Sequence, residues 1–375
     1  MFLNDSRNAL ERHAAGLDGV LAREGLSAME AKAPGELKAL IREYRLPGLW
    51  VPASLGGAGV SPYDGIRLQR ALGARAPSMA LMLTMHHFTI SVCGQLAEAV
   101  PACAQMLRNV AQNDLLVASA FAEGRRGANI FDSTTYMTPD ADGYRINGNK
   151  KPCTMSHCMD IITVGVALQG ADGNKRTGMA IVSADAEGIT RHAFWPVAPL
   201  AAADNHEIRF DNVRVSADQV LLAADGDLET AQIVAGAEVI GLSWFEIIAS
   251  ASYLGVASAM AERVLLNGDI DATERARLGG ELEAAQAALD GAIHLMQTSS
   301  PEQALLARVL MIRFAVQRTI ERCAMHAAEL AGGLAYIKDS EMMTLLAVSR
   351  ALAFHPISRK AAEPMMAATL AGALA

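Results

Sequence analysis

The chain has 375 residues, of which 51% are hydrophobic and 19% charged, and its formal net charge is −8. This length predicts two or three packed units, and the acidic balance argues against a nucleic-acid partner. No run approaches the roughly 18 to 20 uninterrupted apolar residues of a membrane span, and the start lacks a basic stretch followed by an apolar segment. We therefore expect a cytoplasmic protein outside the membrane. The five cysteines show no zinc-site spacing, so we also expect no metal.

Residues 1–113 are predicted to form an α-helical domain. Apolar residues recur at helical spacing from about Asp5 to Glu30, which predicts an amphipathic first helix. Pro47 and Pro52 then break a second helical pattern, and a glycine-rich connection follows. Further helical patterns continue to the end of this region.

Residues 114–222 are predicted to form a β-rich domain. Runs of β-branched and aromatic residues alternate here with Asp-Gly and Asn-Gly pairs, which tolerate the positive φ of tight turns. Two loops inside this region, Phe121 to Asn129 and Asn147 to Asp160, contain the residues most suited to a binding site.

Residues 223–375 are predicted to be helical throughout. Each expected helix has a wide apolar face and a narrow polar strip, which is typical of a bundle buried against itself and against partner subunits. Pro301, directly after two serines, indicates the start of one of these helices.

The two loops of the β-rich region resemble the flavin-binding segments of the acyl-CoA dehydrogenase family. The first family pattern is Thr-Glu-Pro-x-x-Gly-Ser-Asp, and residues 122–129 are Ala-Glu-Gly-Arg-Arg-Gly-Ala-Asn. The second is Asn-Gly-x-Lys-x-Trp-Ile-Thr-Asn, and residues 147–155 are Asn-Gly-Asn-Lys-Lys-Pro-Cys-Thr-Met. Similar segments at residues 51–59 and 210–215 extend the resemblance over nearly the whole chain.

The resemblance implies an α+β fold of the acyl-CoA dehydrogenase type. Its parts would be an N-terminal α-helical domain (1–113), a middle β-barrel or β-sheet domain (114–222) and a C-terminal four-helix bundle (223–375). It also implies FAD as the cofactor and a homodimer or homotetramer as the assembly.

The resemblance further implies which residues bind the flavin. Backbone amides of the first loop can serve whatever their side chains are. Thr154 keeps the family's threonine, which approaches flavin N5, whereas Pro152 replaces a tryptophan that packs on the flavin. Two glycines of the last region match glycines that approach the cofactor of a neighbouring subunit. The expected set is Phe121, Ala122, Glu123, Gly127, Ala128, Pro152, Thr154, Gly332 and Gly333.

The expected chemistry needs a carboxylate that removes the α-proton of an acyl thioester while a hydride passes to the flavin. The family's usual glutamate is missing, since no acidic residue lies between Glu341 and Glu363. Glu246 is one candidate base, near the place where some members carry it, and its alternative is a structural carboxylate paired with an arginine. His355 is the other candidate, in a region where oxygen-activating branches often have histidine.

The first expectation is therefore FAD-dependent α,β-dehydrogenation of an acyl thioester, carried on CoA or on an acyl-carrier protein, with an unspecified electron acceptor. One alternative is a flavin-dependent monooxygenase on the same fold, in which His355 takes the place of the carboxylate. The other is a non-catalytic homologue that acts as a binding or assembly subunit. The replacements at Ala122, Ala128, Pro152 and Glu329 favour this last alternative.

Overall fold

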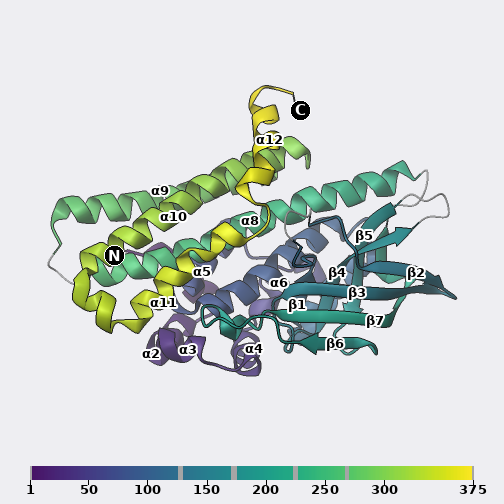
Figure 1. Cartoon of the computed structure of the whole chain (residues 1–375), viewed down its shortest axis with the longest axis horizontal. Coiled ribbons are helices and arrows are strands. Elements are labelled where there is room, and N and C mark those ends of the chain that lie inside the picture. The colour runs from purple at the N-terminus through teal and green to yellow at the C-terminus, as the bar shows by residue number, and fades with distance from the viewer. Residues whose placement is uncertain (1, 126–129, 170–174, 223–226, 267–269, 374–375) are drawn as a thin grey trace.

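The computed structural model describes residues 2–125, 130–169, 175–222, 227–266 and 270–373. Helices, then a sheet, then long helices follow one another along the chain (Figure 1). The α+β order expected from the sequence is confirmed.

Proline residues start most of the longer N-terminal helices. The amides in the first turn of a helix have no acceptor within the helix, so proline, which has no amide hydrogen, loses no hydrogen bond at that position. The single helix expected from Asp5 to Glu30 is instead three helices. Gly16 separates the first helix from the second with φ 85°, and Gly25 separates the second from the third with φ 81°. A positive φ of this kind ends a helix. The N-terminal helices are α1 (Asn4–His13), α2 (Leu17–Glu24), α3 (Leu26–Glu30), α4 (Pro34–Glu43), α5 (Pro62–Arg75), α6 (Pro77–Leu96) and α7 (Pro101–Asn113).

The middle region is one mixed sheet with the strand order β6-β7-β3-β2-β4-β5-β8, and β1 pairs in parallel with β4. The Asp-Gly pair at the start of β3 makes the tight turn from β2, as its sequence indicates. The strands are β1 (Val117–Ala120), β2 (Tyr136–Asp140), β3 (Gly143–Cys153), β4 (Ile161–Gln169), β5 (Lys175–Ser183), β6 (Ile189–His192), β7 (His206–Ser216) and β8 (Val220–Leu222).

The long C-terminal helices α8, α9 and α10 run alongside one another, with α8 packed against the other two, and the shorter α11 and α12 follow (Figure 1). The helices of this region are α8 (Leu228–Leu265), α9 (Ala272–Thr298), α10 (Gln303–Lys338), α11 (Ser340–Ser349) and α12 (Arg359–Leu370). Short 3-10 turns connect the larger elements: η1 (Leu46–Gly48), η2 (Ala53–Leu55), η3 (Ala201–Ala203), η4 (Ala217–Gln219) and η5 (Ala351–Phe354).

Helix α8 is the one described helix that is long and apolar enough to cross a membrane. However, 61% of its most apolar window is buried inside the protein, and a core helix passes the same test of length and composition. The feature is therefore weak evidence for a membrane span.

Helix α6 connects the sheet to the long helices. It contacts β1 and η3 on one side and α8 on the other. Phe88 of α6 meets Phe245 of α8 edge to face, with ring centroids 5.5 Å apart. The region between the strand ends and the α6–α8 pair is therefore where sheet residues and helix residues approach each other.

Candidate flavin and substrate site

The two segments selected from the sequence lie side by side, 121–125 of the first against 147–160 of the second, and residues 147–153 of the second belong to strand β3 and not to a loop. The amide of Lys151 donates to the carbonyl oxygen of Ala122 at 2.8 Å, and Glu123 pairs with Lys151 in a parallel bridge. The Phe121 ring packs over Gly165, where a Cβ atom would come within 2.7 Å of it. The sheet thus holds the first loop in place, while Gly127 and Ala128 lie outside the described residues.

The carboxylate of Glu123 is occupied by contacts within the chain. The fully buried Lys150 donates to its Oε1 at 2.7 Å, and Arg125 pairs with its Oε2 at 2.9 Å. Although burial opposes ionisation, hydrogen bonds from Lys150 and Thr134 hold the pKa of Glu123 well below its usual value. Burial lowers the pKa of Lys150 to about 8. The Glu123 side chain is therefore an anchor of the loop, and only its backbone remains available to a cofactor.

Thr154 lies directly after β3 and is 6% exposed. Its hydroxyl donates to Oδ1 of Asn205 at 2.8 Å. Pro152, in contrast, is exposed, and its ring offers a much smaller stacking surface than the family's tryptophan would. Of these two expected flavin contacts, Thr154 is the one with a fixed orientation.

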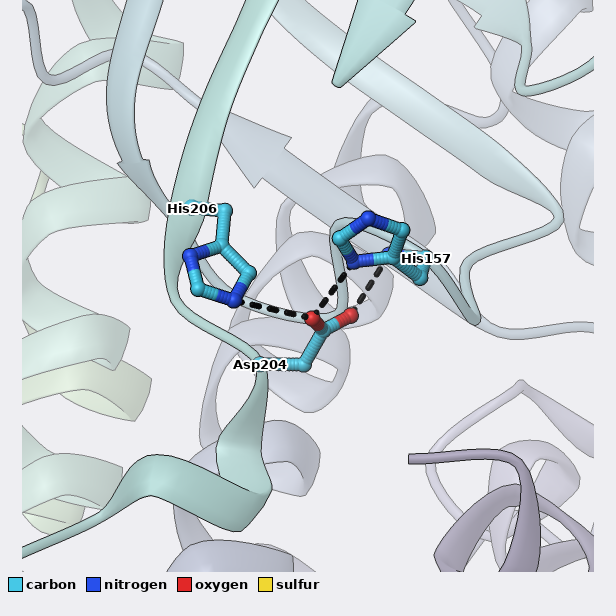
Figure 2. A group of neighbouring side chains, drawn as sticks. All are labelled: His157, Asp204 and His206. Carbon is cyan, nitrogen blue, oxygen red and sulfur yellow. Dashed lines mark hydrogen bonds and ion pairs between the residues drawn. The ribbon is translucent and has the colours of Figure 1, made fainter. Parts of the chain in front are cut away.

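His157, Asp204 and His206 form a group beside Thr154, with both rings close to one buried carboxylate (Figure 2). Asp204 is 2% exposed, and it accepts from the His157 amide and lies 2.8 Å from His157 Nδ1. Nε2 of His206 lies 3.7 Å from the same carboxylate. Residue types and spacing are those of a metal site, although no pattern in the sequence indicated this group.

The hydrogen bonds of His206 exclude it as a metal ligand in this arrangement. Its Nδ1 accepts the backbone amides of Phe194 at 3.1 Å and Trp195 at 3.4 Å. A neutral imidazole that accepts at one nitrogen carries its proton on the other, so Nε2 has no free lone pair for a metal. The group is instead a hydrogen-bonded clamp between residues 154–157 and 203–206.

Zinc and chelators should leave the protein's thermal stability unchanged, because a metal that does not bind the native state cannot stabilise it. The measurement is the melting temperature with excess zinc chloride and with EDTA, for the parent and for His157→Ala. A zinc-dependent rise in the parent that is lost in His157→Ala would show that these side chains do hold a metal.

Glu246, the first candidate base, is fully buried in the middle of α8 and paired with an arginine. Its Oε2 lies 3.0 Å from Nε of Arg313, which is itself 2% exposed, and its Oε1 accepts the amide of Ile357 at 3.2 Å. Burial raises the pKa of Glu246 to about 7, against the opposing effect of Arg313. Glu246 is thus paired with an arginine, as in the structural alternative that the sequence left open.

His355, the second candidate, lies beside the aromatic contact between α6 and α8. Its Nε2 is 2.7 Å from the Tyr253 hydroxyl, and its ring centroid is 5.5 Å from that of Phe245. Burial, with a smaller effect of Arg313, lowers the pKa of His355 to about 4, and burial raises the pKa of Tyr253. At neutral pH both side chains are uncharged, so His355 can donate or accept a hydrogen bond there.

Glu238 is a titratable residue of this region that was not predicted from the sequence. It is half-buried on α8, two helical turns before Phe245 and on the same face, and Gly241 of this face lies against Val92 of α6. Among the residues that the structure describes, its carboxylate has no ion-pair or hydrogen-bond partner, and burial raises its pKa to about 7. An unpaired carboxylate on the α6-facing side of α8 suits a cationic ligand.

The variant Glu238→Gln should be more stable than the parent by about 1–3 kcal/mol at pH 8. The folded pKa is raised above the unfolded one, so the ionised carboxylate destabilises the fold progressively as pH rises from about 4.5 to 7. Urea unfolding at pH 8 and at pH 4.5 measures the effect, which should vanish at the lower pH. Equal stabilisation at pH 8 and at pH 4.5 would contradict a destabilising effect of the ionised carboxylate. The variant Glu329→Gln, at a solvated glutamate, is the matched control.

Gly332 interrupts α10 with φ 82° and ψ 170°. A Cβ atom at Gly332 or Gly333 would meet nothing within 4 Å, and the side chains of Leu334, Tyr336 and Ile337 are exposed. These two glycines, expected near a cofactor of a neighbouring subunit, thus lie on an open, apolar stretch of the surface.

Three comparisons with known proteins bear on this arrangement. Residues 118–213 match the family description "Acyl-CoA dehydrogenase, middle domain". The chain is 34% identical to isobutylamine N-hydroxylase of Streptomyces viridifaciens over 381 residues, which cover 99% of this chain and 98% of that protein.

Two solved structures share the fold over nearly the full length. KijD3, in complex with FMN and an amino-keto-sugar nucleotide, has a TM-score of 0.81 and 22% identity, covering 99% of this chain and 94% of that one. Butyryl-CoA dehydrogenase from Megasphaera elsdenii has a TM-score of 0.78 and 16% identity, covering 99% and 97%. With the full-length match above, the chain belongs to the acyl-CoA dehydrogenase family of flavoenzymes.

Proposed function

We propose that this protein is a flavin-dependent monooxygenase that N-hydroxylates a small primary amine. The observation that carries the proposal is the 34% identity to isobutylamine N-hydroxylase over the whole of both chains. The balanced reaction joins the amine, dioxygen and reduced flavin, and it yields the hydroxylamine, water and oxidised flavin. Dioxygen is thus the electron acceptor that the sequence left unspecified.

The geometry of the candidate bases supports oxygenation over dehydrogenation of an acyl thioester. A base for the α-proton must present a free carboxylate to the substrate. Glu246 is enclosed with Arg313 and also accepts a backbone amide, so both of its oxygens are occupied. His355, which lies close to the position of the missing glutamate, carries no carboxylate. The acyl-thioester dehydrogenation expected first therefore becomes the weaker interpretation.

The residues present fit a flavin. The fixed backbone of the Ala122–Lys151 pairing and the oriented hydroxyl of Thr154 are the features that would hold it, with the open surface at Gly332 of a neighbouring subunit. When bound in its reduced form, the flavin would supply the two electrons that oxygen activation requires. We propose FMN in place of the expected FAD, since KijD3 was solved with FMN.

His355 would act as a hydrogen-bond partner of the neutral amine. Its pKa of about 4 lies some 6 units below that of a typical alkylammonium group, so taking that proton would cost roughly 8 kcal/mol. A neutral imidazole fixed by Tyr253 can instead orient the free amine, whose lone pair is the reacting group. Glu238 would attract the ammonium form that predominates in solution.

We also propose a homodimer or homotetramer. Apolar side chains that a second copy could cover are exposed along the end of α10 and at η5, including Tyr336, Ile337 and Phe354. We retain the cytoplasm as the proposed location.

The test supplies the purified protein with chemically reduced FMN, isobutylamine and labelled dioxygen. Mass spectrometry should show one labelled oxygen atom in the hydroxylamine. A parallel anaerobic reaction offers butyryl-CoA and an artificial electron acceptor. Formation of the unsaturated thioester without oxygen would overturn the proposal in favour of a dehydrogenase, and absence of flavin binding would favour the non-catalytic alternative.

A further inference from the structure

The orientation of the Asn205 side chain follows from one contact. One terminal atom of its amide group lies 2.9 Å from the carbonyl oxygen of Leu200. A carbonyl oxygen only accepts, so that terminal atom must be the NH2 group, and the other must be the oxygen Oδ1. Asn205 is 3% exposed, so water does not compete for this arrangement.

The direction of the Thr154 hydrogen bond follows in turn. The oxygen of Asn205 faces the Thr154 hydroxyl at 2.8 Å, and because it only accepts, Thr154 must donate. A hydroxyl has one proton and two acceptor lone pairs. With its proton committed to Asn205, the Thr154 oxygen can only accept from any further partner.

The residues on either side of Asn205 hold it in place. Asp204 is fixed by His157 (Figure 2), and His206 is fixed by the backbone amides of Phe194 and Trp195. The amide of Ser156 also donates to the carbonyl of Asp204 at 3.1 Å. The clamp therefore holds the backbone at Asn205 in place, while the contacts to Leu200 and Thr154 set the orientation of its amide group.

We propose that Asn205 is a positioning residue that makes Thr154 a dedicated hydrogen-bond acceptor, so that the site binds reduced flavin in preference to oxidised flavin. The inference rests on the proposed function, because it requires Thr154 to face flavin N5. Reduced flavin carries a proton on N5, which Thr154 can accept. Oxidised flavin has only a lone pair on N5, and this lone pair would face a lone pair of the Thr154 oxygen without a proton between them.

The test measures the dissociation constants of oxidised and reduced FMN for the parent, Asn205→Leu, Thr154→Val and the double variant. Asn205→Leu frees the Thr154 proton, so oxidised FMN should bind about tenfold more tightly, the usual size of one hydrogen bond. The midpoint potential of the bound flavin should then fall by about 30 mV for a two-electron couple. Thr154→Val should instead weaken the binding of reduced FMN.

The double variant separates positioning from damage to the fold. In the Thr154→Val background, Asn205→Leu should leave the ratio of the two constants unchanged. A structural role for Asn205 would weaken both flavin states equally, and an unchanged ratio in Asn205→Leu alone overturns the proposal. The smaller change Asn205→Ser should shift the ratio in the same direction and serves if the leucine variant does not fold.

Failure of the proposed function gives a different result. If the parent binds neither form of FMN, both proposals are wrong. If the parent hydroxylates the amine and the ratio does not respond to Asn205→Leu, only the role of Asn205 is wrong.

Discussion

Replacing Arg313 with methionine should destabilise the protein by about 3–5 kcal/mol, the usual result of removing one partner of a buried ion pair. The change leaves Glu246 without a counter-ion in a fully buried position and removes a donor from the carbonyl of Leu352. Urea unfolding at pH 8 is the measurement. The loss should be smaller at pH 5.5, because an unpaired Glu246 is then protonated on folding at little cost.

The double variant Glu246→Leu with Arg313→Met should regain most of this stability, since an apolar pair of similar volume replaces a buried ion pair at little cost. The exposed pair of Arg214 with Asp142 provides the control, and Arg214→Met should leave the stability nearly unchanged. If the double variant folds and still hydroxylates the amine, Glu246 is structural. A folded but inactive double variant would instead restore Glu246 as a catalytic residue.

The outline of the fold could be predicted from the sequence because its signals are local. Proline at helix starts, Asp-Gly at the β2–β3 turn and apolar periodicity each act within a few residues. The three-helix start was missed, although Gly16 and Gly25 were visible, because apolar spacing continues across both glycines. The spacing of apolar residues indicates which side chains are buried, but it does not indicate where the backbone of the helix is interrupted.

The site could be predicted only in part because its contacts join distant segments. Spacing selected Thr154, but the direction of its hydrogen bond is set by Asn205 and, beyond that, by the carbonyl of Leu200. Likewise, the sequence indicated that Glu246 could pair with an arginine, but not that the partner is Arg313 of another helix. Nothing in the sequence near either residue specifies such partners.

Replacing His355 with alanine should lower kcat for amine N-hydroxylation by about 100-fold or more, the usual loss when a positioned proton-transfer or hydrogen-bonding group is removed. The reason is that a neutral imidazole, held by Tyr253, lies beside Phe245, where α8 meets Phe88 of α6. His355→Gln, which keeps a hydrogen-bonding group, should lose less. Hydrogen peroxide should rise as the hydroxylamine falls, because oxygen is then reduced without reaching the amine.

The pH dependence distinguishes this role from that of a base. The pKa of His355, about 4, means that the side chain stays neutral throughout the neutral range. The value of kcat/KM should therefore rise with pH as the amine loses its own proton, in the parent and in His355→Gln alike. A rising limb near pH 6 to 7 that disappears in His355→Gln would show that His355 itself takes the proton. The exposed His294→Ala, on α9, should leave both kcat and the profile unchanged, so that any effect of His355→Ala is specific to its place between Tyr253 and Phe245.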